Sequence, residues 1–417
     1  MPRNTTSWRP SAAGGGAALL LAGLLVTACS NDAPLADRVE AQVRRGQADR
    51  ALVLLDKEIR ARPTDWALQD LRVRVLLQAE RADQALQAYA ERWMREGHDA
   101  SALFRGIAVA LLREGLRSPD GLIRTRAGAA LAVWHSPELW PVFREALAHP
   151  EASIRALAAE GLGKLSGDEA DRLLRAALAD PEHAVRAAAA AALAGRQDPD
   201  TLVALRVALA DPAPSVRMSA ATVLARGGDP RASRLLTGML TDPSESIRMQ
   251  ATEALGHLGL PDTVSAVRPL LRDRNPYVRI YAGEALARLG EPEGRRRLLG
   301  ALADPRPTVA LYASEALSNL GDAAGSELLA AALASGEDVS VRLYAAWTLA
   351  RLGDAQGRPV LESLLQHPDA QVRMQAVWTL GEFRDASGVP GLKRGVLDAA
   401  HPVRWQAAWA LARGMGT

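Results

Sequence analysis

Residues 242–256 read DPSESIRMQATEALG, and this stretch is the clearest copy of a unit that recurs along most of the chain. It predicts one helix with its start signal attached, because Asp242 can cap a helix N-terminus and Pro243 suits the first helical position, where no backbone donor is needed. Apolar residues then follow at helical spacing as far as Leu258, and Gly259 can end the helix. The helix has one apolar stripe, which must be buried against other helices.

The unit returns at a fixed period of 31 residues, and its marker is an Ile or Val followed by an Arg. The first six copies carry Arg124, Arg155, Arg186, Arg217, Arg248 and Arg279. The seventh has Ala310 at the Arg position, and after one inserted residue the period resumes at Arg342, Arg373 and Arg404. Each copy also has room for a second helix. Because a lone helix pair cannot bury its apolar stripe, the copies must stack on one another.

A polar residue precedes the Arg position by six residues in most copies, as Asp211 precedes Arg217; in two copies it is a histidine, His149 or His367. With Asp-Pro at 211–212, Val-Arg at 216–217 and Leu-Gly-Asp at 352–354, the chain resembles the HEAT-repeat superfamily, most closely the short repeats named after phycobilisome lyases. The resemblance implies an all-α fold, a right-handed α-solenoid of helix-pair repeats, over residues 118–417. It also implies an Asp–Arg ladder between successive units, in which a hydrogen bond to a charged group contributes about 1.5–3 kcal/mol.

Residues 1–28 predict a secretory signal peptide, because two arginines precede a short apolar segment that is followed by small residues. The ending VTAC at 26–29 resembles a bacterial lipobox, which implies that Cys29 is lipidated and becomes the mature N-terminus. The alternative is an ordinary signal peptide with an incidental cysteine. Cys29 is the only cysteine, so no intramolecular disulfide can form.

Ser30, where an Asp is absent, resembles lipoproteins that are sorted to the outer membrane of Gram-negative bacteria. We therefore expect a lipid-anchored protein on the periplasmic side of the cell envelope, at the outer membrane. Several acyl chains on one residue would anchor it stably, since each buried methylene contributes about 0.8 kcal/mol. Residues 29–34 would form the lipidated N-terminus and a linker.

Residues 35–117 follow a different period. Ala51 and Leu55 recur 34 residues later as Ala85 and Tyr89, a spacing that resembles tetratricopeptide repeats. Glu80 stands where the family would repeat Gly46. A tetratricopeptide-like region or a plain helical-hairpin adaptor both fit this segment.

The composition offers little for catalysis or for nucleic acid. The chain has 50 basic and 48 acidic residues, and two arginines fall in the segment expected to be removed, so we expect no nucleic-acid partner. No phosphate-binding loop, zinc pair or nucleophile elbow is present, and none of the seven histidines is followed by Glu. We therefore expect no enzyme activity, no cofactor and no metal site.

One register of the repeat carries an aromatic stripe. The residues two and five positions after the Arg position include Tyr281, Tyr312, Tyr344, Trp347, Trp378 and Trp409. The two positions are neighbours on a helix surface, so stacked copies would align these side chains. The stripe is either packing between adjacent helices or a binding surface for a protein, and a polysaccharide could stack on it as well.

These observations give two hypotheses. The first is a non-catalytic, lipid-anchored scaffold or adaptor that mediates protein–protein interactions in the bacterial envelope. The second is an enzyme or accessory subunit of the HEAT-like lyase type that binds a cofactor or a polysaccharide. The second predicts a concave pocket with clustered polar groups whose pKa values are shifted.

Overall fold

The computed structural model describes residues 33–96, 101–134, 136–334, 338–383 and 388–414. All regular secondary structure in these ranges is helical, which confirms the predicted all-α solenoid. The chain divides into two compact units, residues 1–97 and 98–417. The expected signal peptide and Cys29 lie outside the described residues. Within the described ranges, no helix has the length and apolar character needed to cross a membrane.

The described part of the first unit consists of four consecutive helices in which each packs against the next. They are α2 (Ala33–Arg44), α3 (Ala48–Ala61), α4 (Trp66–Gln78) and α5 (Ala82–Glu96). Gly46 and Glu80 both have positive φ, 72° and 56°, at the turns that precede α3 and α5. Ala51 and Ala85 are both fully buried. The 34-residue recurrence is therefore visible in the backbone, while the assignment to tetratricopeptide repeats stays a prediction.

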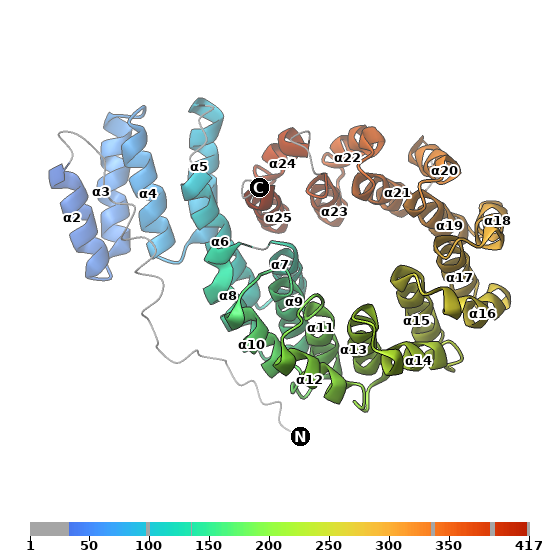
Figure 1. Ribbon diagram of the computed structural model, residues 1–417. Helices are drawn as coiled ribbons and strands as arrows, with labels where there is room; N and C mark the ends of the chain where they lie inside the picture. Colours follow the sequence, from blue (N-terminus) through green and yellow to red (C-terminus); the bar gives the residue numbers. More distant parts are fainter. Residues whose placement is uncertain (1–32, 97–100, 135, 335–337, 384–387, 415–417) are drawn as a thin grey trace, which may run out of the picture. The chain divides into compact units, whose positions relative to one another are not determined.

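The second unit begins with α6 (Ser101–Arg117) and continues as two alternating sets of helices (Figure 1). We call the Arg-marked set the inner layer. Its members are α7 (Gly121–Val133), α9 (Ala152–Leu162), α11 (His183–Ala192), α13 (Pro214–Arg226), α15 (Glu245–Leu258), α17 (Pro276–Arg288), α19 (Pro307–Asn319), α21 (Val339–Arg351), α23 (Ala370–Leu380) and α25 (His401–Gly414).

The intervening helices form the outer layer. Its members are η2 (Pro137–Leu139), α8 (Trp140–Leu147), α10 (Asp168–Ala177), α12 (Pro199–Ala208), α14 (Pro230–Met239), η3 (Pro261–Thr263), α16 (Val264–Val267), η4 (Arg268–Arg272), α18 (Pro292–Ala301), α20 (Ala323–Ala334), η5 (Ala355–Gly357), α22 (Arg358–Leu364) and α24 (Val389–Gly395).

The two layers pack differently. Each inner helix packs against the inner helices before and after it, whereas the described outer helices of successive repeats barely meet, with limited contact between α10 and α12 and between α20 and η5. Closer approach on one side curves a solenoid toward that side. The exposed face of the inner layer is therefore the concave face of the second unit (Figure 1).

The start of α15 differs from the prediction. The helix begins at Glu245 with Ser244 as N-cap, and Pro243 lies in the preceding turn. Asp242 caps that turn instead, because its Oδ1 accepts a hydrogen bond from the backbone N–H of Ser244 at 2.8 Å. The guanidinium of Arg248 donates to the carbonyls of Asp242 and Pro243 at 2.8 and 3.1 Å, which holds the turn outside the helix. The predicted end at Gly259 is confirmed, with φ 64°.

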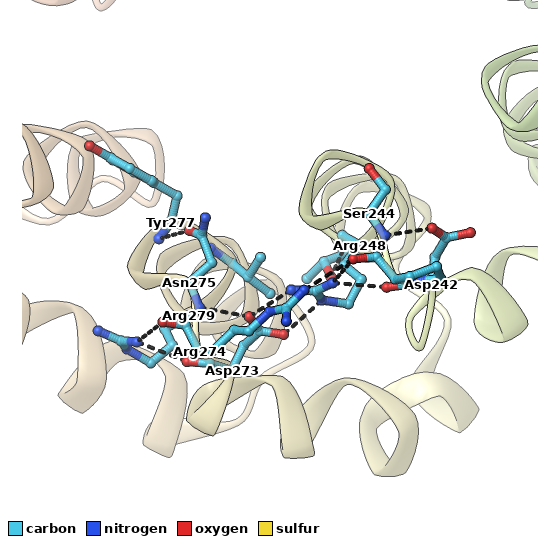
Figure 2. A network of polar contacts seen from close by, with 11 residues as sticks. Asp242, Ser244, Arg248, Asp273, Arg274, Asn275, Tyr277 and Arg279 are labelled. Carbon is cyan, nitrogen blue, oxygen red and sulfur yellow. Dashed lines mark hydrogen bonds and ion pairs between the residues drawn. The ribbon is translucent and has the colours of Figure 1, made fainter.

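The Asp–Arg ladder exists as a set of two-pronged contacts. In Figure 2, the Arg248 side chain extends from its own turn to Asp273 of the next repeat, with Nε–Oδ2 and Nη2–Oδ1 distances of 2.8 and 3.0 Å. We call such a contact a rung. Four rungs are present among the described residues: Arg155–Asp180, Arg186–Asp211, Arg248–Asp273 and Arg373–Asp398.

Three arginines at the same position make no rung in the described chain. Arg217 and Arg279 donate to the carbonyls of their own turns but not to the next Asp. For Arg279 the next Asp is Asp304, which pairs with Arg306 instead. The Nε of Arg342 is buried without a partner, and a histidine stands at the Asp position of the next unit. At the junctions that follow these three arginines, α13–α15, α17–α19 and α21–α23, the inner helices meet over shorter stretches than at the junctions with rungs.

The end of the array is covered by its beginning. The last helix, α25, packs against α6 and α7, and the Trp409 ring lies so close to Gly115 that an added Cβ there would come within 3.3 Å of it. Trp405 and Trp409 are 5% and 2% exposed. The repeat array of the second unit thus closes on itself.

Candidate functional site

The predicted aromatic residues lie on five successive inner helices. Tyr281 is on α17, Tyr312 on α19, Tyr344 and Trp347 on α21, Trp378 on α23 and Trp409 on α25. All but Trp409 are half-buried, so each keeps part of its ring on the concave face. Trp409 is buried at the closure and cannot contact a partner while the array is closed.

Three of these rings form a continuous chain. The centroids of Tyr312 and Tyr344 are 5.7 Å apart, and those of Tyr344 and Trp347 are 5.9 Å apart. Tyr277, which the sequence analysis missed, extends the chain by an edge-to-face contact with Tyr312 at 5.1 Å. It lies one helical turn before Tyr281, and that spacing was the available signal. The aromatic chain joins α17, α19 and α21, so its rings also pack successive helices together.

Carboxylates run beside the aromatic chain. Glu253, Glu284 and Glu315 occupy the same register on α15, α17 and α19. Glu315 accepts hydrogen bonds from the Tyr344 hydroxyl and, at 2.9 Å, from the Arg351 guanidinium. Arg351 also lies 4.5 Å from the centroid of the Trp347 ring, a cation–π contact. One carboxylate, one arginine and two aromatic rings thus form a single cluster between α19 and α21.

Glu284 and Glu253 have different surroundings. Arg288 pairs with Glu284 one turn earlier on the same helix, with an Nη2–Oε1 distance of 2.7 Å. Glu253 makes no hydrogen bond or salt bridge with any described residue. Its side chain is exposed locally, yet the surrounding inner helices displace more distant water, and this desolvation raises the pKa of Glu253 above its ordinary value. The charges of His257 and Arg288 lower it, and those of Glu284 and Glu315 raise it.

Desolvation and the neighbouring carboxylates also raise the pKa values of two tyrosines. Desolvation is the main cause that raises the pKa of Tyr281 to about 12, and the charge of Glu253 adds to it. The pKa of Tyr344 is raised as well, by desolvation and by its hydrogen bond to Glu315. Both hydroxyls therefore stay protonated at neutral pH, and that of Tyr344 donates to Glu315. The concave face of α15–α21 combines aromatic rings, neutral hydroxyls and negative charge.

The C-terminal part of the stripe belongs to the closure. Trp378 and Trp409 line a cavity of about 10 Å³ together with Trp134 and Arg413. The indole Nε1 of Trp409 and the Oε1 of Gln406 are buried there without a hydrogen-bond partner. The stripe predicted as one surface is therefore two structures, an open part from Tyr281 to Trp347 and a part from Trp378 to Trp409 at the closure.

The two histidines at the Asp position serve as turn caps. The Nδ1 atoms of His149 and His367 accept hydrogen bonds from backbone N–H groups two residues later, at 3.0 and 3.1 Å. Asp180 does the same with its Oδ1 at 2.9 Å. Burial lowers the pKa of His149, so its ring stays neutral with the proton on Nε2, which faces the Leu116 carbonyl at 3.1 Å. In the described part of the chain, no three His, Cys, Asp or Glu side chains gather as metal ligands would.

The family model for HEAT repeats matches six overlapping segments: residues 109–194, 170–256, 202–275, 233–318, 264–338 and 326–412. Among solved structures, the chain is similar to the complex of CpcE and CpcF of phycocyanin lyase from Nostoc. The two share 25% identity over 59% of this chain and 93% of that chain, with a TM-score of 0.39. It is also similar to human deoxyhypusine hydroxylase in complex with glycerol, with 23% identity over 60% of this chain and 97% of that chain and a TM-score of 0.32. A search of curated proteins found no match.

Proposed function

The chain belongs to the HEAT-repeat family, and from this premise we propose that it is a non-catalytic scaffold that binds a protein partner on the concave face of its repeat array. The observation that carries the proposal is the open aromatic chain of Tyr312, Tyr344 and Trp347, which is half-buried on adjacent inner helices. Tyrosine and tryptophan anchors often dominate protein interfaces and can each contribute about 2 kcal/mol or more.

The proposed location is the periplasmic side of a bacterial membrane, at the outer membrane. This part of the proposal is supported by the N-terminal sequence alone, in which an apolar segment ends in a lipobox-like VTAC. The lipid on Cys29 would tether the protein, and the two helical units would extend from it toward partners in the envelope.

An enzyme or accessory subunit that binds a cofactor or polysaccharide is the competing proposal. It requires polar groups that converge on a pocket. A cavity of about 410 Å³ in the C-terminal part of the second unit is lined by His367, Arg373 and Asp398 among others, but Arg373 and Asp398 already pair with each other as a rung. This arrangement favours the scaffold.

The test is crosslinking in cells followed by affinity capture of the membrane-anchored protein, comparing wild type with the variant Trp347→Ala. Trp378 and Trp409 are left intact because both line the cavity at the closure. We expect the variant to lose a specific protein partner while keeping its helicity and melting temperature. Val207→Ala is the matched control, since Val207 is 71% exposed on the outer helix α12.

Three results decide between the proposals. Loss of a captured protein from the folded Trp347→Ala variant, but not from Val207→Ala, supports a protein-binding concave face. Retention of the same partners by Trp347→Ala would remove the aromatic chain as the anchor. Captured material that is polysaccharide rather than protein would favour the competing proposal.

A further inference from the structure

The three rings of the open aromatic chain come from two helices with little direct contact. Tyr312 lies on α19, whereas Tyr344 and Trp347 lie on α21. Among successive inner helices, α19 and α21 meet over the shortest stretch, and the outer helix α20 packs against both. Ala310 stands at the Arg position of α19, so no rung can form there. The spacing of the rings therefore depends on the side chains that cross this junction.

Glu315 of α19 contacts two side chains of α21. Its Oε2 accepts a hydrogen bond from the Tyr344 hydroxyl, and its Oε1 accepts one from the Arg351 guanidinium at 2.9 Å. The Glu315 side chain is only 16% exposed, so water competes little for these bonds. The rings of Tyr312 and Tyr344, 5.7 Å apart, add a contact across the same junction. Glu315 thus ties both Tyr344 and Arg351 to α19.

The same two side chains contact the Trp347 ring. The guanidinium carbon of Arg351 lies 4.5 Å from the centroid of this ring, and the Tyr344 ring lies 5.9 Å from it at an interplanar angle of 47°. An arginine can make both of its contacts at once, because a planar guanidinium donates to a carboxylate in its plane and stacks on a ring with its face. Glu315 therefore holds the two side chains that hold Trp347.

We propose that Glu315 and Arg351 are positioning residues, which fix the Trp347 ring and its distance from Tyr312 before a partner binds. The proposal rests on the proposed function and adds how its anchors are presented. Neither residue has to touch the partner, since both act through Trp347. An anchor that is already fixed loses less conformational freedom on binding, so positioning raises affinity without a new contact.

The matched control is the equivalent arginine on α17. Arg288 stands at the position of Arg351 and pairs with Glu284, which stands at the position of Trp347. Both residues of this pair belong to one helix, so the pair neither crosses a junction nor holds a tryptophan ring. Arg288→Met removes the same residue type at the same register, and Met keeps the apolar stem in both variants.

The test is fluorine NMR of the full chain labelled with fluorotryptophan. The chain has nine tryptophans, so the Trp347 resonance is assigned by its loss in Trp347→Phe. A fixed ring tumbles with the whole molecule and gives a broad line, whereas a released ring reorients within nanoseconds and gives a narrow one. We expect Arg351→Met and Glu315→Ala to narrow this line at least about twofold, Arg351→Lys to give an intermediate width, and Arg288→Met to leave it unchanged.

Line width is the readout because loss of a charge alone shifts a resonance but does not narrow it. Arg351 is 44% exposed, so Arg351→Met tests the proposal even if Glu315→Ala fails to fold. An unchanged line in folded Arg351→Met, or equal narrowing in Arg288→Met, would overturn the positioning role.

The capture experiment separates this proposal from the proposed function. Arg351→Met should lower the amount of captured partner several-fold although Trp347 is intact. A partner that is fully retained by Arg351→Met but lost from Trp347→Ala would overturn the positioning role and leave the scaffold standing. A wild-type chain that captures no partner overturns the scaffold, and the positioning role falls with it whatever the line widths.

Discussion

Two parts of the second unit are built from the same repeat but are held together differently. From α9 to α13, every junction between inner helices carries a rung, Arg155–Asp180 and then Arg186–Asp211. From α17 to α23, no described junction carries one, and tyrosine rings and the Glu315 carboxylate bridge α17, α19 and α21 instead. The difference shows that side chains of another kind can take the place of a rung at these two junctions, and the binding surface proposed above lies there.

Acid should separate the two parts most clearly, because it acts on every rung at once. The hydrogen bonds from Arg155 and Arg186 hold the pKa values of Asp180 and Asp211 below the ordinary 3.8. A carboxyl whose pKa is lower in the folded state stabilises the fold above its unfolded pKa, and that stability is lost as pH falls through the folded value. We expect protection against hydrogen exchange, measured relative to the intrinsic rate at each pH, to fall more in α9–α13 than in α17–α21 below pH 3.8. An equal fall in both parts would contradict a ladder-specific role.

A single rung should carry several kcal/mol of stability. The side chains of Arg248 and Asp273 are 7% and 9% exposed, so Arg248→Ala leaves a buried carboxylate without its partner. We expect it to lower the free energy of unfolding by about 3–5 kcal/mol, measured by urea denaturation. The matched control is Arg217→Ala, which removes the same residue type from a junction without a rung. Its loss of hydrogen bonds to two carbonyls should cost only about 1 kcal/mol.

In the part without rungs, the largest effect should come from the middle of the aromatic chain. Tyr312 contacts Tyr277 of α17 and Tyr344 of α21, so Tyr312→Ala removes ring contacts on both sides of α19. We expect a loss of about 2 kcal/mol, measured in the same denaturation experiment. Gln250→Ala is the control at the same register on α15, and it should change stability little. A Tyr312→Ala protein as stable as wild type would show that the rings serve binding and not packing.

Much of this comparison could be foreseen from the sequence, because the period of 31 residues fixes the register of every Arg and Asp. The missing rungs could be foreseen only where a residue is replaced, as at Ala310 and His367. Asp304 pairs with Arg306, two residues later, and not with Arg279. Which of the two arginines pairs with Asp304 depends on side-chain geometry. Arg217 and Asp242 fit the motif fully yet do not meet.

The closure could not be foreseen either. Whether α25 reaches α6 and α7 depends on small rotations that accumulate over all the repeats, and no local residue pattern reports their sum. For this reason Trp409 shares the register of Trp347 and Trp378 in the sequence but has a different environment in the fold. The shared register of the aromatic residues identified the candidate surface in the sequence. In the fold, only the part up to Trp347 is open, and Trp378 and Trp409 lie at the closure. Glu253, Glu284 and Glu315 share one register in the sequence. Which of them forms an ion pair depends on the side-chain directions of Arg288 and Arg351, and the sequence does not give these directions.

The smallest expected effect is a gain, obtained by restoring one rung in the part that lacks them. In His367→Asp the new carboxylate would keep the turn cap, because Asp180 caps its own turn in the same way. It would also give a partner to Arg342, whose Nε is buried without one. We expect stability to rise by about 1 kcal/mol, read from the urea midpoint.

The control for this restored rung is the same substitution at the same repeat position, His149→Asp. There Arg124 already contacts Glu151, and the His149 ring faces the Leu116 carbonyl, a contact that Asp would lose. His149→Asp should therefore not stabilise the protein. If both substitutions had the same effect, the gain would come from the turn and not from a rung.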